Sequence, residues 1–315
     1  MLKVDKKRLL EFEDQLNPAD PESGRIPVKI LGYGEVTATF QIGDISDIAF
    51  KRMPPFPNER ASVEYCNAVD ECSQILAYTG IKVVDYDFTR ITNSAGEHMV
   101  YIIQPRFDAE TIGHKRLRNC TRAEFEIMLV KILENMAKLW RKNQKDGPGE
   151  MLGLDSQISN WVFSEDALKG DQQPAYFDLS TPLYRRNGKE MLDVEVFLKS
   201  IPSFLVWVVR RYVIQGVLDR YYDMRAVAID LIANLYKEGH PQRIPVAIET
   251  ANRFFKQDAP DLEIAPLTQK EIDNYYQGDK FIWAFLLACR RLDRFIKTRL
   301  LKKKYNFILP GPVKR

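Results

Sequence analysis

The feature that most constrains this chain is a change of sequence pattern near residue 107. Before this point, short β-branched segments are separated by glycine and other turn residues, which is typical of strands. After it, apolar residues recur at helical spacing over long segments such as residues 124–144. The sequence therefore predicts an α+β protein with a small β-rich N-terminal part and a larger, mainly helical C-terminal part.

Local signals place the expected elements along the chain. Strands are predicted at residues 28–31, 36–42, 45–51, 82–88 and 99–105. Helices are predicted at residues 1–17, 58–78, 124–144, 193–237 and 278–304, the fourth of them interrupted at Pro202 and near Gly216. Asn58 is a suitable N-cap for the second helix because its side chain can accept a hydrogen bond from a free backbone amide.

The composition excludes several classes of protein. Hydrophobic residues make up 45% of the 315 residues and charged residues 28%, which fits a globular domain with a sizeable core. The N-terminus lacks the apolar run of a signal peptide, and the most apolar stretch, residues 281–289, is too short to cross a bilayer, which takes about 20 residues. The four cysteines and three histidines show no metal-ligand spacing. A soluble cytoplasmic protein without zinc or disulfides is expected.

The charge is unevenly distributed between the body of the chain and its C-terminal end. From Arg290 onward there are ten basic residues and one acidic residue, so the end carries about +9 and the body about −6. In the last predicted helix, apolar residues at helical spacing should dock on the core: Ile282, Phe285, Leu286, Cys289, Leu292, Ile296 and Leu300. The basic residues on its other faces are typical of a solvated surface. Alternatively, they form a patch for an acidic partner or membrane; no recognised motif supports nucleic acid.

A glycine-containing turn and a lysine are expected to lie close together in the predicted sheet. Gly32 and Gly34 stand at a strand–turn–strand boundary, where glycine lets backbone amides approach a phosphate. Alone, this pair is more typical of an ordinary hairpin. Lys51 closes an apolar strand seventeen residues after Gly34. Two antiparallel strands would bring its ammonium beneath the glycine turn to bind phosphate, although an exposed lysine at a sheet edge is the ordinary alternative.

The helix after this strand carries a candidate partner for the lysine. Glu71 lies twenty residues after Lys51 and could reach a neighbouring strand. Glu59 and Glu64 on the same helix compete for this role. Most helical glutamates are solvated surface residues, so that interpretation of Glu71 stays open.

Three further polar residues flank predicted strands. Asp155 and Asn160 are five residues apart, just before an apolar strand, and Asp178 ends another strand eighteen residues later. A carboxylate and a carboxamide could serve a substrate hydroxyl and a metal ion, and an aspartate is a hard oxygen ligand for magnesium. The alternative for each is a turn residue whose side chain caps the backbone.

The order of these residues resembles the protein-kinase signature, in which a glycine-rich turn, a strand lysine and a helix glutamate precede an aspartate–asparagine pair and a strand-end aspartate. The chain is similar to the protein-kinase-like superfamily over about residues 28–180. The resemblance implies a bilobal fold with a small β-rich N-lobe and a larger helical C-lobe. It divides the chain into an N-terminal helical extension (1–25), a nucleotide-binding N-lobe (26–106) and a C-lobe (107–315) that holds the catalytic loop and the basic C-terminal helix.

The resemblance also implies nucleotide-binding roles for residues of the N-lobe. Gly32 and Gly34 would cover the phosphates of ATP, Lys51 would bind the α- and β-phosphates, and Glu71 would orient Lys51 through an ion pair. Gln104 lies in the segment that resembles the hinge between the lobes, against which the adenine would sit.

In the C-lobe, the resemblance assigns catalysis and metal binding. Asp155 would be the catalytic residue that positions the acceptor hydroxyl and takes its proton, while Asn160 and Asp178 would hold Mg²⁺. The chain departs from the pattern at several places. Thr37 stands where a third glycine is expected, Gly153 stands where a histidine is usual, and Leu179 and Ser180 replace the phenylalanine and glycine after the metal-binding aspartate.

The segment after the metal-binding aspartate decides which branch of the superfamily the chain resembles. Only fifteen residues separate Asp178 from Asp193, near the start of the next predicted helix, which leaves little room for a peptide-binding activation segment. This resembles small-molecule kinases such as the aminoglycoside or choline phosphotransferases. The expected function is therefore an ATP- and magnesium-dependent phosphotransferase acting on a hydroxyl of a small molecule. The alternative is a pseudokinase that serves as a nucleotide-binding or protein-interaction module.

Overall fold

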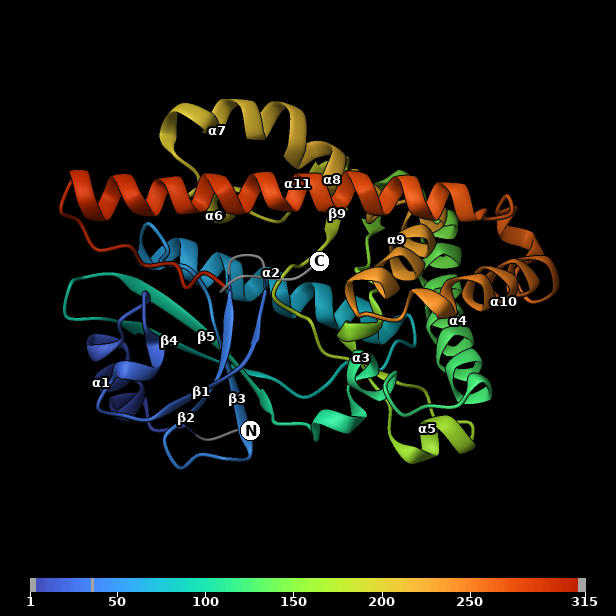
Figure 1. The fold of residues 1–315 in the computed structure, drawn as a ribbon, viewed down its shortest axis with the longest axis horizontal. Coiled ribbons are helices and arrows are strands. Elements are labelled where there is room, and N and C mark those ends of the chain that lie inside the picture. Colours follow the sequence, from blue (N-terminus) through green and yellow to red (C-terminus); the bar gives the residue numbers. More distant parts are fainter. Residues whose placement is uncertain (1–3, 35–36, 311–315) are drawn as a thin grey trace.

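The computed structural model describes residues 4–34 and 37–310, and it joins a sheet-based N-terminal part to a mainly helical C-terminal part (Figure 1). The antiparallel sheet has the strand order β1-β2-β3-β5-β4. Its strands are β1 (Val28–Tyr33), β2 (Ala38–Ile42), β3 (Ile48–Arg52), β4 (Asp87–Thr92) and β5 (His98–Pro105). The expected α+β fold class is confirmed.

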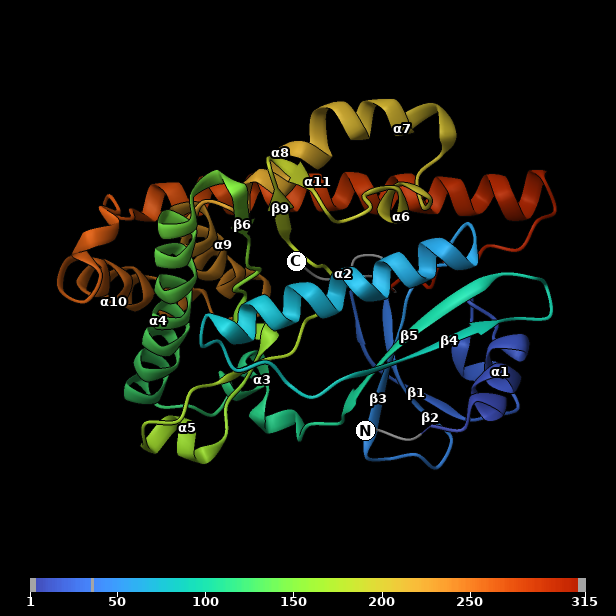
Figure 2. The ribbon, with the colours of Figure 1, turned by 180° about the vertical axis from the view of Figure 1, so that it is seen from behind.

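Two helices accompany this sheet. α1 (Lys6–Gln15) places Leu9 and Phe12 in a buried cluster with Phe40 of β2 and Phe50 of β3. α2 (Glu59–Tyr78) follows β3 in the chain and lies between the sheet and α11 in both views (Figures 1 and 2). The side chain of Asn58 accepts a hydrogen bond from the amide of Ala61, so the expected N-cap of α2 is confirmed.

The C-terminal part is built around two long buried helices, α4 (Arg122–Asp146) and α9 (Met224–Lys237). The other helices are α3 (Gly113–Arg116), α5 (Glu165–Lys169), α6 (Glu195–Leu198), α7 (Ser203–Val209), α8 (Gln215–Arg220), α10 (Ile244–Gln257) and α11 (Gln269–Phe295). π-helical turns continue α7 at Arg210–Ile214 and α11 at Ile296–Leu300. Short strands form two small sheets: β6 (Glu150–Leu152), β9 (Tyr184–Arg186) and β10 (Lys189–Glu190), and β7 (Trp161–Val162) with β8 (Ala175–Tyr176).

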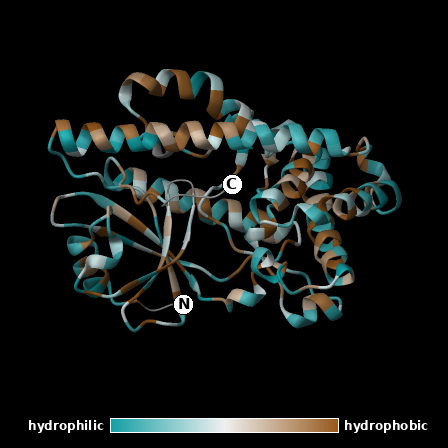
Figure 3. Cartoon of the chain, viewed as in Figure 1, coloured by the Kyte–Doolittle hydropathy of each residue, from teal (hydrophilic) through white to brown (hydrophobic). Residues whose placement is uncertain are grey.

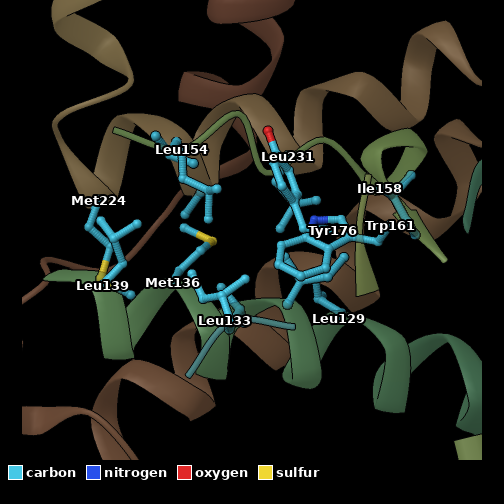
Figure 4. Close-up of a cluster of buried hydrophobic side chains, with 14 of the residues drawn as sticks. Leu129, Leu133, Met136, Leu139, Leu154, Ile158, Trp161, Tyr176, Met224 and Leu231 are labelled. Atoms are coloured by element: carbon cyan, nitrogen blue, oxygen red, sulfur yellow. The ribbon is translucent and has the colours of Figure 1, made fainter. Parts of the chain in front are cut away.

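The main hydrophobic core lies where these elements meet (Figure 4). Leu133 and Met136 of α4 and Leu231 of α9 are buried against Leu154 and Trp161, which flank the segment before β7. Burying each such side chain is worth about 1.5–3 kcal/mol relative to exposure. The core therefore holds the segment between Leu154 and Trp161 in a fixed position.

Three of the expected elements are wrong in their bounds. The helix expected at 278–304 begins nine residues earlier, at Gln269, and its α-helical part ends at Phe295. The segment predicted as a strand at 82–88 leaves the sheet, because Lys82 and Val84 exchange backbone hydrogen bonds with Tyr176 of the C-terminal part; β4 begins only at Asp87. The helix expected at 193–237 is divided into α6, α7, α8 and α9. The break expected at Pro202 is confirmed between α6 and α7, but Gly216 lies inside α8, and the next break follows Arg220. The strand expected at 36–42 and the helix expected at 1–17 begin at residues outside the described ranges.

Candidate active site

The register of the sheet brings the glycine turn and the lysine side by side. Gly32 of β1 pairs with Thr39 of β2, and Thr39 pairs in turn with Lys51 of β3. The amide of Gly34 donates to the carbonyl oxygen of Thr37 across the turn, at 3.0 Å. A Cβ atom at Gly34 would lie 2.3 Å from the Thr37 hydroxyl oxygen, so a larger residue here would force the Thr37 side chain to move. The tip of the turn, residues 35 and 36, lies outside the described ranges.

Lys51 contacts the segment expected to bind metal. Its Nζ lies 2.6 Å from Oδ1 of Asp178 and 3.2 Å from Oγ of Ser180, and both Lys51 and Ser180 are buried. The Ser180 hydroxyl donates to the same Asp178 oxygen at 2.8 Å, and the Ser180 amide donates at 3.2 Å. Burial alone would raise the pKa of Asp178, but the Lys51 ammonium and the Ser180 hydrogen bonds outweigh it and hold that pKa below its usual value. Asp178 is therefore an anion at neutral pH.

The β7–β8 hairpin brings the aspartate–asparagine pair to the same place. Trp161 pairs with Tyr176, and the amide of Phe177 donates to the carbonyl oxygen of Asn160 at 3.1 Å. The side-chain nitrogen of Asn160 donates to the carbonyl oxygen of Asp155, also at 3.1 Å. Asp155, Asn160 and the residue before Asp178 are thus connected by hydrogen bonds.

Asp155 lies in an unusual electrostatic environment. Burial of its carboxylate, together with the negative charges of Asp230 and Asp178, raises the pKa of Asp155 well above the usual range of a carboxyl group. The amide of Gln157 donates to Oδ1 of Asp155 at 3.3 Å and partly offsets this effect. A carboxylate with a raised pKa is a stronger base than an ordinary one, which suits a group that must take a proton from a hydroxyl.

In the described part of the chain, Lys51 and Glu71 do not form the expected ion pair. Glu71 instead accepts a hydrogen bond from Tyr184 at 2.7 Å and pairs with Arg186, both on β9. The reason is helical phase: at 100° per residue, Glu71 points about 200° away from Val69, which α2 buries in the core. The ion-pair assignment is therefore corrected: the partners of Glu71 are Tyr184 and Arg186.

Tyr65 is the α2 residue that reaches the segment expected to bind metal, and the sequence interpretation missed it. Its hydroxyl donates to the carbonyl oxygen of Ser180 at 2.8 Å, and its ring is buried. A signal was present in the sequence, because Tyr65 shares the buried face of α2 with Val69, Cys72 and Leu76 at helical spacing.

Asp230 is a second residue that the sequence interpretation missed. It is 6% exposed and lies within α9, whose other residues are mostly apolar. Oδ1 accepts hydrogen bonds from Tyr275 at 2.8 Å and from Asn234 at 2.9 Å, while Oδ2 is buried without a partner among the described residues. A charged residue inside an apolar helical pattern was the signal that could have identified it.

The structure also shows the contacts of Gln104 and Gly153, two other positions considered in the sequence analysis. The side-chain amide of Gln104 donates to the carbonyl oxygen of Phe177 at 2.8 Å, so the end of β5 is bonded to the residue before Asp178. A Cβ atom at Gly153 would lie 2.9 Å from the carbonyl oxygen of Tyr221, which explains why no larger residue stands there. The departure at Gly153 is therefore a matter of packing.

The donor set fits a magnesium ion held jointly by protein and phosphates. Within residues 4–34 and 37–310, no group of three or more His, Cys, Asp or Glu side chains could hold a metal ion. Magnesium in phosphoryl-transfer sites needs only one or two protein ligands, because phosphate oxygens and water supply the others. Hydrogen bonds from the described residues reach only Oδ1 of Asp178, so Oδ2 is free for a cation. The Asn160 side chain uses its nitrogen toward Asp155, so its oxygen could serve as a second ligand.

Comparison with known proteins places the chain in a family. The family model of DUF6206, a family of unknown function, matches residues 11–294. The chain belongs to the DUF6206 family. No curated protein matches it.

Solved structures similar to this DUF6206 chain include aminoglycoside phosphotransferases. The GDP and kanamycin complex of APH(2'')-IIIa has a TM-score of 0.35 and 12% identity, and the alignment covers 78% of this chain and 97% of that one. The GDP complex of a point mutant of aminoglycoside 2'-phosphotransferase-IIIa has a TM-score of 0.34 and 12% identity, over 74% of this chain and 91% of that one. The similarity extends over most of the chain but is distant, so the function proposed below rests on the site itself. None of the described helices is long and apolar enough to span a membrane.

Proposed function

We propose that this chain is a magnesium-dependent phosphotransferase that moves the γ-phosphoryl group of ATP to a hydroxyl of a small molecule. The observation that carries the proposal is the contact between Lys51 and Asp178 at 2.6 Å, with Asp155 close enough for the charges of the two carboxylates to interact. A cation for phosphates, an anion for a metal and a candidate base thus gather in one place. Phosphoryl transfer depends on such positioning and charge neutralisation more than on covalent chemistry.

Each residue would contribute one part of the reaction. Bound magnesium would neutralise phosphate oxygens, with Asp178 and Asn160 as its protein ligands. Lys51 would donate to the phosphates, as the strand lysine of kinases does. Asp155 would accept the proton of the acceptor hydroxyl while the hydroxyl oxygen bonds to the γ-phosphorus and the β–γ bridging bond breaks. The nucleotide then leaves as ADP, and the transferred phosphoryl group stays on the acceptor.

The test separates nucleotide binding from transfer. Asp155→Asn should lower the transfer rate at least about 100-fold, because a carboxamide cannot take the proton. Its affinity for Mg-ATP should stay within about twofold, because in the proposed reaction Asp155 contacts the acceptor hydroxyl and not the phosphates. The exposed Asp171→Asn is the matched control. The assay follows release of ADP from ATP and of GDP from GTP, because a lysine and a magnesium ion contact the phosphates and not the base. Sugars, amino alcohols and nucleosides serve as acceptors. Full activity in Asp155→Asn would remove that residue from its proposed role.

The alternative is a nucleotide-binding module that performs no transfer. One observation favours it: Glu71 is paired with Arg186, so the lysine of the site lacks the ion-pair partner that active kinases use. A thermal-shift titration with Mg-ATP on the wild type and on Asp178→Asn identifies nucleotide binding. Stabilisation of the wild type without turnover of any acceptor would support the module over the enzyme.

A further inference from the structure

A large exposed apolar surface lies outside the candidate active site. Twelve large hydrophobic side chains are exposed among the described residues. Eight of them fall on α7 or α11 with their π-helical turns, and a ninth, Leu301, follows the turn of α11 directly. The nine are Phe204, Trp207, Val208, Tyr212, Phe281, Leu292, Phe295, Leu300 and Leu301. Large apolar side chains gathered in exposed positions on two packed helices indicate an interaction site. We call the surface formed by these residues the α7–α11 surface.

α7 is apolar on two opposite sides. One side, with Leu205, Val206 and Val209, packs against Phe285 and Cys289 of α11. In both ribbon views α7 runs beside the C-terminal half of α11, and the ribbon coloured by hydropathy shows hydrophobic residues along both helices (Figures 1, 2 and 3). A surface helix normally buries one apolar stripe and exposes a polar one. α7 has no polar stripe, so its second apolar side needs another partner.

The outward side of α7 carries aromatic residues at helical spacing. Trp207 is 66% exposed and Tyr212 is 70% exposed, and their rings are in edge contact with centroids 5.9 Å apart. Phe204, one turn before Val208, is 65% exposed. Leu292 and Leu300 of the last helix, which the helical pattern predicted to dock on the core, are exposed as well.

A groove connects the two helices at one end of this surface. It has a volume of about 440 Å³ and is lined by Phe204 and Val206 of α7 and by Ile296 and Leu301 at the end of α11. The apolar residues of both helices therefore meet at one place on the surface.

Positive charge accompanies the exposed apolar side chains. Arg211 lies on the π-helical turn that continues α7, and Arg291, Arg299 and the run Lys302–Lys304 lie on or just after α11; all are exposed. None of them forms an ion pair with another residue of the described ranges. Exposed aromatics beside unpaired cations are the combination that binds an anionic membrane: the rings enter the headgroup region and the cations attract the lipid charge.

We propose that the α7–α11 surface docks the protein on anionic lipid membranes. Phe204, Trp207 and Tyr212 would enter the interface between headgroups and acyl chains. Arg299 and the lysines that follow would contact the lipid phosphates and carboxylates. The protein would lie on the membrane surface without spanning it.

Vesicle sedimentation of the full chain, without nucleotide, tests the proposal independently of the phosphotransferase function. The wild type should bind phosphatidylcholine vesicles that contain phosphatidylserine and should bind pure phosphatidylcholine vesicles at least about tenfold more weakly. Added salt should weaken the binding. Phe204→Ser with Trp207→Ser, and separately Arg299→Glu with Lys303→Glu, should each reduce it at least about tenfold.

Two controls and a spectroscopic signal sharpen this test. Tyr78→Ser removes an 88% exposed aromatic outside the α7–α11 surface, and Lys256→Glu reverses an exposed charge on α10; both should bind like the wild type. Vesicles should shift tryptophan emission to the blue in the wild type. The shift should disappear in Trp207→Phe, which keeps its affinity within about threefold because an apolar ring remains.

Three outcomes would overturn the membrane proposal. One is that the wild type binds neither kind of vesicle. Another is self-association in sedimentation equilibrium that Phe204→Ser with Trp207→Ser abolishes, which would make the surface an interface between copies of this chain. The third is salt-dependent binding to RNA with no binding to vesicles, lost in Arg299→Glu with Lys303→Glu.

Discussion

At the scale of single residues, one carboxylate oxygen organises the candidate site. Oδ1 of Asp178 accepts the Lys51 ammonium and both donors of Ser180, and the Ser180 carbonyl oxygen accepts the Tyr65 hydroxyl. This chain of bonds links β3 and α2 to the segment 178–180. Charge-assisted hydrogen bonds such as that of Lys51 are about twice as strong as neutral ones. Tyr65 therefore performs the linking role that Glu71 was expected to have.

A pair of α2 variants tests this exchange of roles. Tyr65→Phe removes the donor to a buried carbonyl oxygen and should lower the free energy of unfolding by about 1–3 kcal/mol while weakening Mg-ATP binding. Glu71→Gln alters a pair on the other side of α2 and should leave Mg-ATP affinity within about threefold of the wild type. Denaturant unfolding and calorimetric titration measure both quantities. A larger loss of affinity in Glu71→Gln than in Tyr65→Phe would contradict the assignment.

The second residue-scale prediction concerns pH. Asp155 can take a proton only as the carboxylate, and burial with the charges of Asp230 and Asp178 raises its pKa to about 8. The transfer rate at saturating Mg-ATP should therefore rise with pH as Asp155 ionises. Asp230→Asn removes a neighbouring negative charge, which favours the ionised form of Asp155 and lowers its pKa. The rising limb of the rate profile should move to lower pH in this variant; an unchanged limb would contradict the coupling.

At the scale of elements, a buried ion pair joins α1 to the sheet. Arg52 of β3 donates to Glu13 of α1 through two nitrogens, at 2.7 and 2.8 Å, and both side chains are at most 3% exposed. Tyr101 of β5 also donates to Glu13, and Arg52 donates to the carbonyl oxygen of Asn306 at 2.9 Å. The N-terminal helix, the sheet and the C-terminal segment thus meet at one guanidinium.

Breaking this pair should destabilise the N-terminal part strongly. Glu13→Gln leaves the Arg52 charge buried without its counter-charge, which costs about 3–5 kcal/mol. Glu64→Gln is the matched control, because it breaks the exposed Arg60–Glu64 pair of α2 and should change the midpoint of urea unfolding little. Equal losses of stability in the two variants would show that the buried pair stabilises the protein no more than the exposed pair does.

At the scale of the whole molecule, the order of elements could be predicted from local patterns, but contacts between distant segments could not. Helical and strand periodicity located α2, α4 and β5, and the spacing of residues identified Lys51, Asp155 and Asp178 as candidates. That Glu71 points away from Lys51 depends on the rotation of α2, which the buried face fixes. The pair of Glu13 with Arg52 joins segments 39 residues apart, and no local signal specifies it.

The same limit explains why the sequence did not predict which residues of α11 are buried. Its apolar residues follow one helical pattern, yet Cys289 is buried while Leu300 is 65% exposed. Which of them is covered depends on how far α7 extends along α11, and that is a property of the whole fold. Residues after α11 return to the sheet, where Ile308 joins the cluster under α1.

The central claim is that Lys51, Asp155 and Asp178 surround one triphosphate and its metal. A crystal structure of the chain with Mg²⁺ and a non-hydrolysable ATP analogue tests it most directly. The account predicts magnesium bound to Asp178 and Asn160, and the Lys51 ammonium within hydrogen-bond distance of the phosphates. A nucleotide bound elsewhere, with Lys51 still on Asp178 and no metal beside it, would contradict the account.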